Sequence, residues 1–154
     1  MSFRNLNTYE SMVEAGEEQS FHTRYERAVE RFVQSMEVRS TYESVIDGRP
    51  VSTGKHFTDT SPIDAEMVVG DFSLGGKKEA GLAITSARRA FQTWSVMDLD
   101  KRLVIFRKAA EIMRRELFEI SAAITIDNGK NRYEAVGEVD EAIDFISFYA
   151  DRLE

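Results

Sequence analysis

The sequence predicts a helix-rich α/β fold, and three features support this prediction. Apolar residues recur at steps of three and four over several long stretches, which is the period of amphipathic helices. Between residues 41 and 72 this period is lost, and the stretch holds both prolines, tight-turn signals and β-branched runs typical of short strands. The length of 154 residues suits one domain of ordinary size.

The N-terminal stretch, residues 1–16, shows no clear period and ends at Gly16, so it is predicted to be an irregular arm with one turn of helix. From Glu17 onward the spacing becomes helical, and the two acidic residues at 17 and 18 suit the positive start of a helix. A helix is therefore predicted near 18–37. Its apolar positions are Phe21, Tyr25, Ala28, Phe32 and Met36.

The following stretch predicts strands. The pair Asp47-Gly48 is a tight-turn signal between two short extended runs, so a hairpin is predicted near 43–52. Further strands are predicted near 56–60 and 66–72. Residues 70–76, GDFSLGG, lack the spacing of phosphate-binding loops and are predicted to be a turn from strand to helix.

Three helical patterns follow Gly76. The first is carried by Ala80, Ile84, Ala87, Phe91 and Trp94. The second predicts one helix over 99–119, with Leu103, Phe106, Ala110 and Met113 on its buried face and basic side chains opposite. The third includes Val139, Ala142, Ile143 and Ile146 and still runs at Glu154. A pattern interrupted in this way indicates a chain that was cut rather than finished.

Charge and composition exclude several classes of function. The 20 basic and 27 acidic residues give a net charge of -7, and the two signs are interspersed, so neither nucleic acid nor an anionic membrane is an expected partner. No apolar run is long enough to span a bilayer and no signal pattern opens the chain, so a cytoplasmic location is predicted. The absence of cysteine removes disulfides, thiolate metal ligands and a thiol nucleophile.

Few residues are candidates for chemistry. The two histidines, His22 and His56, have no partner pattern for a catalytic triad or a zinc site and are predicted to be structural or surface residues. A group of acids crowds the last helical pattern and is predicted to be mostly solvated surface. It consists of Glu134, Glu138, Asp140, Glu141 and Asp144.

Several strings in order resemble the aldehyde dehydrogenase family: FRN near the start, RYERAVERF, VIDGRPV, DTSPID, ARRAFQTW, KRLVIFRKAAEIMRREL, DNGKN and EVDEAIDFISFYA. The helix before the hairpin and the string EAIDFISFYA are similar to its 1-pyrroline-5-carboxylate dehydrogenase branch. The resemblance covers essentially the whole chain. It implies the N-terminal part of that fold, an incomplete Rossmann-like nucleotide domain, with 1–16 as an arm and 17–154 belonging to the truncated NAD-binding domain.

In the family, a cysteine attacks an aldehyde, hydride passes to NAD, and a glutamate-activated water releases the acid. The pyrroline branch oxidises glutamate semialdehyde to glutamate in proline catabolism. The cysteine, its partner residues and the nucleotide-contacting glycines all lie further along such chains than residue 154. The resemblance therefore implies no catalytic and no cofactor-binding residue here, and this chain alone is expected to be inactive and to bind no NAD.

Two sets of positions can be transferred from the family. Glu141 matches a position near the substrate pocket, where a carboxylate can pair with an ammonium group, although it can equally be a plain surface acid. Asp127 and the main chain around Thr60 match positions that help to hold a structural monovalent cation. Asp127 can instead cap the turn at Asn128-Gly129.

The family also implies partners: the missing C-terminal part of the dehydrogenase, other copies in a homo-oligomer, and a small-molecule substrate. The alternative is a free-standing interaction or scaffold module derived from the same fold. Either way, a surface built to be covered should leave an apolar patch. The residues predicted for it are Val68, Val69, Phe72, Ile143, Phe145 and Phe148.

Overall fold

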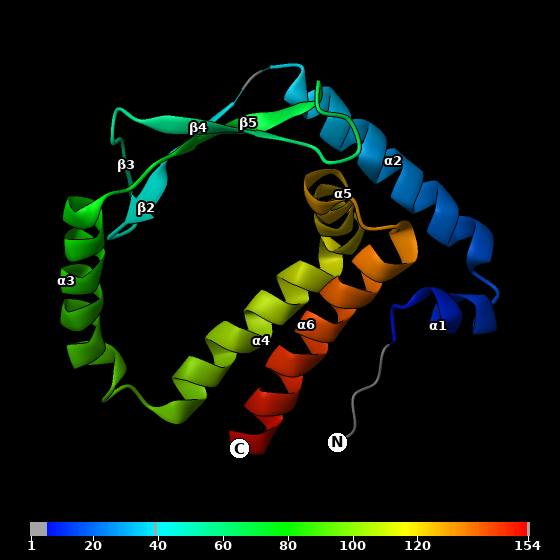
Figure 1. The fold of residues 1–154 in the computed structure, drawn as a ribbon. Helices are drawn as coiled ribbons and strands as arrows, with labels where there is room; N and C mark the ends of the chain where they lie inside the picture. Colours follow the sequence, from blue (N-terminus) through cyan, green and yellow to red (C-terminus); the bar gives the residue numbers. More distant parts are fainter. Residues whose placement is uncertain (1–5, 39, 154) are drawn as a thin grey trace. The chain divides into compact units, whose positions relative to one another are not determined.

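The computed structural model describes residues 6–38 and 40–153. The chain divides into two compact units, one formed by Met1–Ser35 with Asp98–Glu154 and the other by Met36–Met97. Each unit has its own architecture, so the two are described in turn. Figure 1 labels their helices and strands.

The first unit is built from helices. They are α1 (Tyr9–Glu14), α2 (Glu18–Met36), α4 (Leu99–Arg115), α5 (Leu117–Asn128) and α6 (Arg132–Leu153). The long helix α6 packs along both α4 and α5, and α1 contacts it near its N-terminal half (Figure 1). The predicted helices near 18–37 and through 139–153 are confirmed, and the N-terminal arm contains a helix of six residues.

The core of this unit combines aromatic and aliphatic side chains. Phe21 is fully buried, lies edge-on to Phe118 with 5.7 Å between ring centroids, and stacks with Tyr133 at 6.0 Å. Burial of one such ring contributes about 1.5–3 kcal/mol to the stability of the fold. The aliphatic part of the core is formed by residues with 2 % exposure or less, namely Leu103, Leu117, Val136, Val139 and Ile143.

The single helix predicted over 99–119 is wrong, because the chain bends at Glu116. Its backbone angles, φ -96 and ψ 19, lie outside the helical range, so α4 ends at Arg115 and α5 begins at Leu117. The sequence pattern missed α5 because apolar residues surround most of this helix, which therefore lacks an amphipathic period. Gly129, at φ 80, ends α5 in the left-handed conformation.

Individual side chains also depart from the predicted faces. Phe106, predicted to be in the core, is 47 % exposed, whereas Leu103 on the same helix is 2 % exposed. Ile143 and Val69, predicted to lie on an exposed patch, are buried, and only Phe145 of that set is exposed, at 40 %. The misplaced residues show that apolar spacing locates a helix more reliably than it locates the boundary of its buried stripe.

The second unit combines small sheets with one helix. Its elements are β1 (Thr41–Tyr42), β2 (Ser44–Ile46), β3 (Arg49–Val51), β4 (His56–Thr60), β5 (Val68–Ser73) and α3 (Lys77–Trp94). Strands β2 and β3 pair antiparallel across Asp47 and Gly48, whose φ angles of 57 and 70 suit a tight hairpin turn. The sheet order is β1-β5-β4, with β5 parallel to β1 and antiparallel to β4. The predicted hairpin and both predicted strands are confirmed.

Helix α3 is tied to the hairpin by its polar face. The Asp47 carboxylate pairs with the Arg89 guanidinium at 2.5 Å and accepts a hydrogen bond from the Ser86 hydroxyl at 3.2 Å. These contacts, the Arg89 hydrogen bond first, hold the pKa of Asp47 below its usual value. All residues of α3 are described and none of them is buried, so within its unit the helix is attached rather than enclosed.

Candidate functional site

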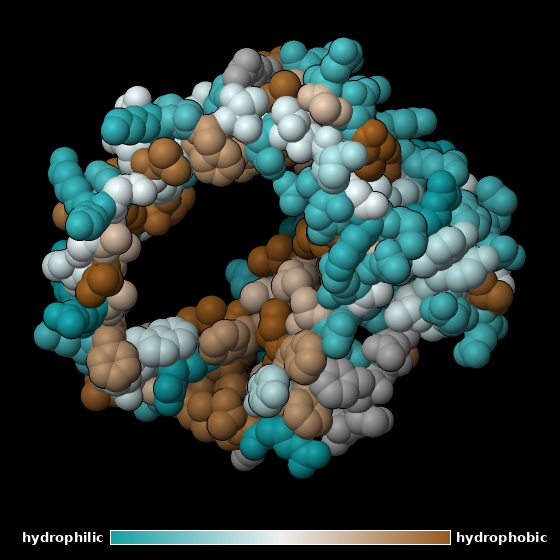
Figure 2. Space-filling view, viewed as in Figure 1, coloured by the Kyte–Doolittle hydropathy of each residue, from teal (hydrophilic) through white to brown (hydrophobic). Residues whose placement is uncertain are grey.

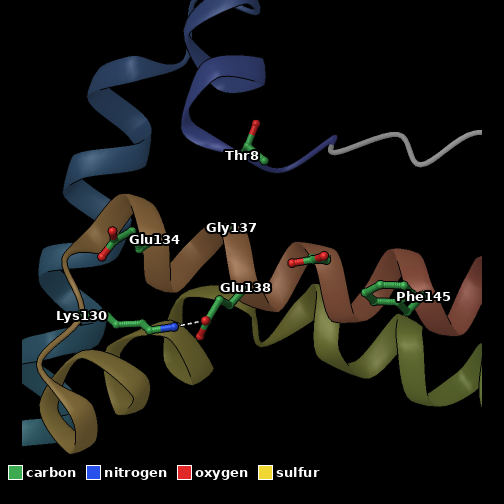
Figure 3. Close-up of a pocket in the computed structure, with 7 residues that line it drawn as sticks. Thr8, Lys130, Glu134, Gly137, Glu138 and Phe145 are labelled. Carbon is green, nitrogen blue, oxygen red and sulfur yellow. Dashed lines mark hydrogen bonds and ion pairs between the residues drawn. The ribbon is translucent and has the colours of Figure 1, made fainter.

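Glu141, the residue predicted to contact a substrate, lines a hollow in the first unit. The hollow has a volume of about 670 Å³ and is open on one side. Five of its lining residues come from α6, and the others are Lys130, just before that helix, and Thr8, just before α1 (Figure 3). The lining residues from α6 are Glu134, Gly137, Glu138, Glu141 and Phe145.

The three carboxylates of the hollow follow from helical spacing. Glu134, Glu138 and Glu141 are separated by four and three residues, so they share one face of α6. The Lys130 ammonium pairs with Glu138 and offsets one of the three charges (Figure 3). Within the described part of the chain, neither Glu134 nor Glu141 forms an ion pair. The hollow therefore keeps a negative character suited to a cationic group.

The rim opposite α6 is formed by the turn that starts α1. Thr8 caps this short helix, because its hydroxyl accepts a hydrogen bond from the Ser11 backbone N–H at 3.3 Å. Thr8 lies across the hollow from the face of α6 that carries Glu134 and Glu138 (Figure 3). The arm thus contributes to the hollow, which the irregular pattern of residues 1–16 did not predict.

Asp140 was grouped with the surface acids, and this prediction is wrong. Its side chain is buried, with 1 % exposure. One carboxylate oxygen accepts a hydrogen bond from the Asn7 side-chain amide at 2.6 Å, and the other accepts one from the Asn7 backbone N–H at 3.2 Å. The signal that could have found it is its spacing, four residues after Val136 and three before Ile143, both fully buried.

The predicted site residues belong to three different elements. Glu141 is exposed and lines the hollow, and its contact with a substrate stays a prediction. Asp127 is exposed in the last turn of α5, and Thr60 is exposed at the end of β4 in the second unit. The described residues contain no group of three or more His, Cys, Asp or Glu side chains placed to hold a metal ion. The monovalent cation at Asp127 and Thr60 stays a prediction.

Both histidines make structural contacts. The His22 Nδ1 atom lies 2.9 Å from an Arg132 guanidinium nitrogen, and the imidazole packs against Tyr9 and Phe21. The His56 Nε2 atom lies 3.5 Å from a Glu43 carboxylate oxygen. Neither arrangement contains the hydroxyl nucleophile that a catalytic histidine would activate.

A second hollow, the α4–α6 groove, is apolar. It has a volume of about 270 Å³ and is lined by Leu103, Phe106, Phe145, Ile146, Tyr149, Ala150 and Leu153. Tyr149 and Leu153 are 60 % and 59 % exposed. Hydrophobic atoms gather over α4 and the C-terminal half of α6 in Figure 2. Exposure of several large apolar side chains in one groove is unusual for a surface that meets only water.

A membrane-spanning helix must reach a minimum length and be predominantly apolar. In residues 6–38 and 40–153, no helix is both long and apolar enough to cross a bilayer.

The fold and the carboxylate-lined hollow can now be compared with known proteins. Residues 50–154 match the model of the aldehyde dehydrogenase family. The chain belongs to this family, and its helix-rich architecture with small sheets matches the N-terminal part of the aldehyde dehydrogenase fold.

Within the family, the similarity is to 1-pyrroline-5-carboxylate dehydrogenases, as the motifs predicted. The chain is 40 % identical over 114 residues to that of Bacillus pumilus, which covers 73 % of this chain and 22 % of the relative. It is 36 % identical over 117 residues to 1-pyrroline-5-carboxylate dehydrogenase 1 of Halalkalibacterium halodurans, covering 76 % of this chain and 23 % of the relative.

Solved structures agree with this similarity. A point mutant of the Thermus thermophilus 1-pyrroline-5-carboxylate dehydrogenase superposes with a TM-score of 0.80 at 31 % identity, covering 98 % of this chain and 27 % of that one. A Thermus enzyme with bound NAD superposes with a TM-score of 0.79 over the same shares at 31 % identity. The chain therefore spans about a quarter of the length of the relatives and structures that it matches.

Proposed function

We propose that these residues are the N-terminal part of an NAD-dependent 1-pyrroline-5-carboxylate dehydrogenase that oxidises glutamate semialdehyde to glutamate. In this proposal, residues 1–16 are an arm and residues 17–154 belong to the NAD-binding domain of a cytoplasmic enzyme of proline catabolism. The names of the relatives support the reaction, and the bound NAD of the Thermus structure supports the cofactor. The observation that carries the proposal for this chain is the placement of Glu141 in an open hollow on α6.

The chain itself lacks the means for the chemical step. Aldehyde oxidation by this route needs a thiolate, and the sequence contains no cysteine. In the turn before α3, the Gly76 backbone N–H donates to the Glu79 carboxylate at 2.8 Å, so this donor is already engaged within the chain. We assign the nucleophile and the nucleotide contacts to the other three quarters of the enzyme. The residues described here would form scaffold and part of the substrate entrance.

Glu141 is the residue that we expect to meet the substrate. Its carboxylate is exposed and lies next to Glu138, whose charge Lys130 already offsets. Glutamate semialdehyde carries an ammonium group, and an ammonium–carboxylate contact is a strong, charge-assisted hydrogen bond. The open wall of the hollow lets a small molecule approach this carboxylate without any change in the backbone.

Glutamine at position 141 tests this role. The test uses a chimera that joins these 154 residues to the remaining part of the Bacillus pumilus relative. In this chimera, Glu141→Gln should lower kcat/KM for glutamate semialdehyde, and the loss should correspond to about 1.5–3 kcal/mol of transition-state stabilisation. A simple aliphatic aldehyde, which has no ammonium group, should lose little. Asp151→Asn, on the same helix but outside the hollow, is the matched control. Equal losses for the two aldehydes, or no loss for either, would assign Glu141 to the solvated surface.

The α4–α6 groove supports a partner for this chain. Its exposed aromatic and aliphatic side chains match the expectation that a surface built for burial stays uncovered in an isolated part. We propose that the remaining part of the dehydrogenase covers the groove, and that the complete enzyme is a homo-oligomer. A free-standing interaction module would present the same groove to a different protein. Activity of the chain when it is joined to the remaining part of the dehydrogenase would therefore favour the dehydrogenase over the interaction module.

A further inference from the structure

A buried carboxylate joins the arm to α6. Asp140 is 1 % exposed, and its two oxygens accept the two hydrogen bonds donated by Asn7, one from the side chain at 2.6 Å and one from the backbone at 3.2 Å. The two residues are 133 positions apart in the sequence. Burial of a carboxylate is costly unless such donors replace its water. The stability of this part of α6 therefore depends on the arm being in place.

Apolar contacts guide the arm to the same position. Met12 on α1 is 8 % exposed and belongs to the main core. The Tyr9 ring lies 5.1 Å from that of Phe21 and 4.6 Å from that of Tyr133, measured between centroids. These contacts are few, because α1 has only six residues. Without the Asn7 donors, the arm would have to leave Asp140 unsatisfied or lift and admit water.

We infer that Asn7 and Asp140 form a latch that closes residues 6–16, the strap, onto α6. The latch has a consequence for the carboxylate-lined hollow, because Thr8 directly follows Asn7 and forms the rim opposite α6. A closed latch fixes this rim, and an open latch removes it. The state of one residue pair therefore sets the width of the hollow, independently of which molecule binds there.

The absence of cysteine makes the latch measurable. Met12→Cys introduces a single thiol on the buried side of the strap, and the rate of its alkylation by iodoacetamide reports how often the strap lifts. Ser121→Cys, a nearly isosteric change at a fully buried position of α5, reports opening of the core away from the strap. Each reporter is combined with Asn7→Ala, which changes a half-buried residue and preserves the fold, and with Asp151→Asn as a control.

The latch predicts a selective effect. Asn7→Ala should accelerate alkylation at position 12 by at least about tenfold, since the side-chain hydrogen bond to the Asp140 carboxylate is lost, and at position 121 by less than about twofold. Asp140→Asn should act in the same direction, and the effects of the two changes should not add, because they remove the same contact. An unchanged rate at position 12, an equal increase at both reporters, or additive effects would overturn the inference.

Discussion

Asp47 illustrates how a single exposed charge organises a local structure. It occupies the hairpin turn with a positive φ of 57, and its carboxylate meets Arg89 and Ser86 of α3. The resulting pKa lies below the ordinary value of 3.8, with the Arg89 hydrogen bond as the largest cause. A lowered pKa in the folded state means that the contact stabilises the unit above that ordinary value and is lost as the pH falls below it.

The titration of Asp47 tests this contact. Observed by carbon-detected NMR, its carboxyl group should titrate below 3.8, and Arg89→Gln should move the midpoint back toward that value. The stability difference between the original chain and Arg89→Gln should be full above about pH 4 and should shrink at lower pH. Glu79, whose pKa is lowered by the hydrogen bond from the Gly76 backbone N–H, serves as an internal control, since Arg89→Gln should leave its pKa unchanged.

Alanine substitutions in α4 should lower the free energy of unfolding by amounts that depend on how deeply the replaced side chain is buried. Leu103→Ala should lower the free energy of unfolding by about 2–5 kcal/mol, whereas Arg115→Ala should change it by less than about half a kcal/mol. Phe106→Ala should fall between the two, because this ring is 47 % exposed in the groove. Denaturant unfolding measures all three. An equal cost for Leu103 and Arg115 would show that the assigned buried face of α4 is wrong.

At the scale of elements, the sequence predicts most of what the structure contains. The hairpin at Asp47-Gly48, strands β4 and β5, and helices α2, α3 and α6 follow from turn chemistry and apolar period. The bend at Glu116 does not, because apolar residues lie on most sides of α5 and leave no period that could mark its start. Helix α5 packs against α6, and this tertiary contact cannot be read from the period of its own residues.

In the candidate site, too, some features follow from the sequence pattern and others depend on tertiary contacts. Spacing alone places Glu134, Glu138 and Glu141 on one face of α6, and the hollow confirms that they lie together. The spacing of Asp140 between two buried positions of α6 could have indicated its burial, but its partner Asn7 belongs to the irregular arm, so no local pattern could reveal the contact between them. Contacts between segments distant in sequence remain beyond an argument from periodicity.

The end of α5 provides a prediction at this scale. Gly129 adopts φ 80, a conformation that costs an L-residue with a side chain about 1–2 kcal/mol. Gly129→Ala should therefore destabilise the first unit by about that amount, because it strains the turn from α5 into α6. Gly137→Ala, at a helical glycine whose added Cβ would meet nothing within 4 Å, should be neutral or stabilising. Both changes are compared by denaturant unfolding, and equal effects would contradict the account.

At the scale of the whole molecule, the structure combines well-formed cores with uncovered apolar surface. The first unit buries Phe21, Ile143 and their neighbours completely, yet it leaves the α4–α6 groove open. The chain also spans about a quarter of the dehydrogenases that it resembles and contains no cysteine. These facts fit together if the chain supplies scaffold and a substrate contact while the rest of the enzyme supplies the chemistry.

The most direct test is NADH formation from glutamate semialdehyde, measured for this chain alone and for its chimera with the remaining part of the Bacillus pumilus relative. We expect no turnover by the chain alone, because it has no thiol to attack the aldehyde, and clear turnover by the chimera. Circular dichroism and gel filtration first establish that the chimera folds as the relative does. Turnover by the pure chain, or a correctly folded chimera without turnover, would contradict the account.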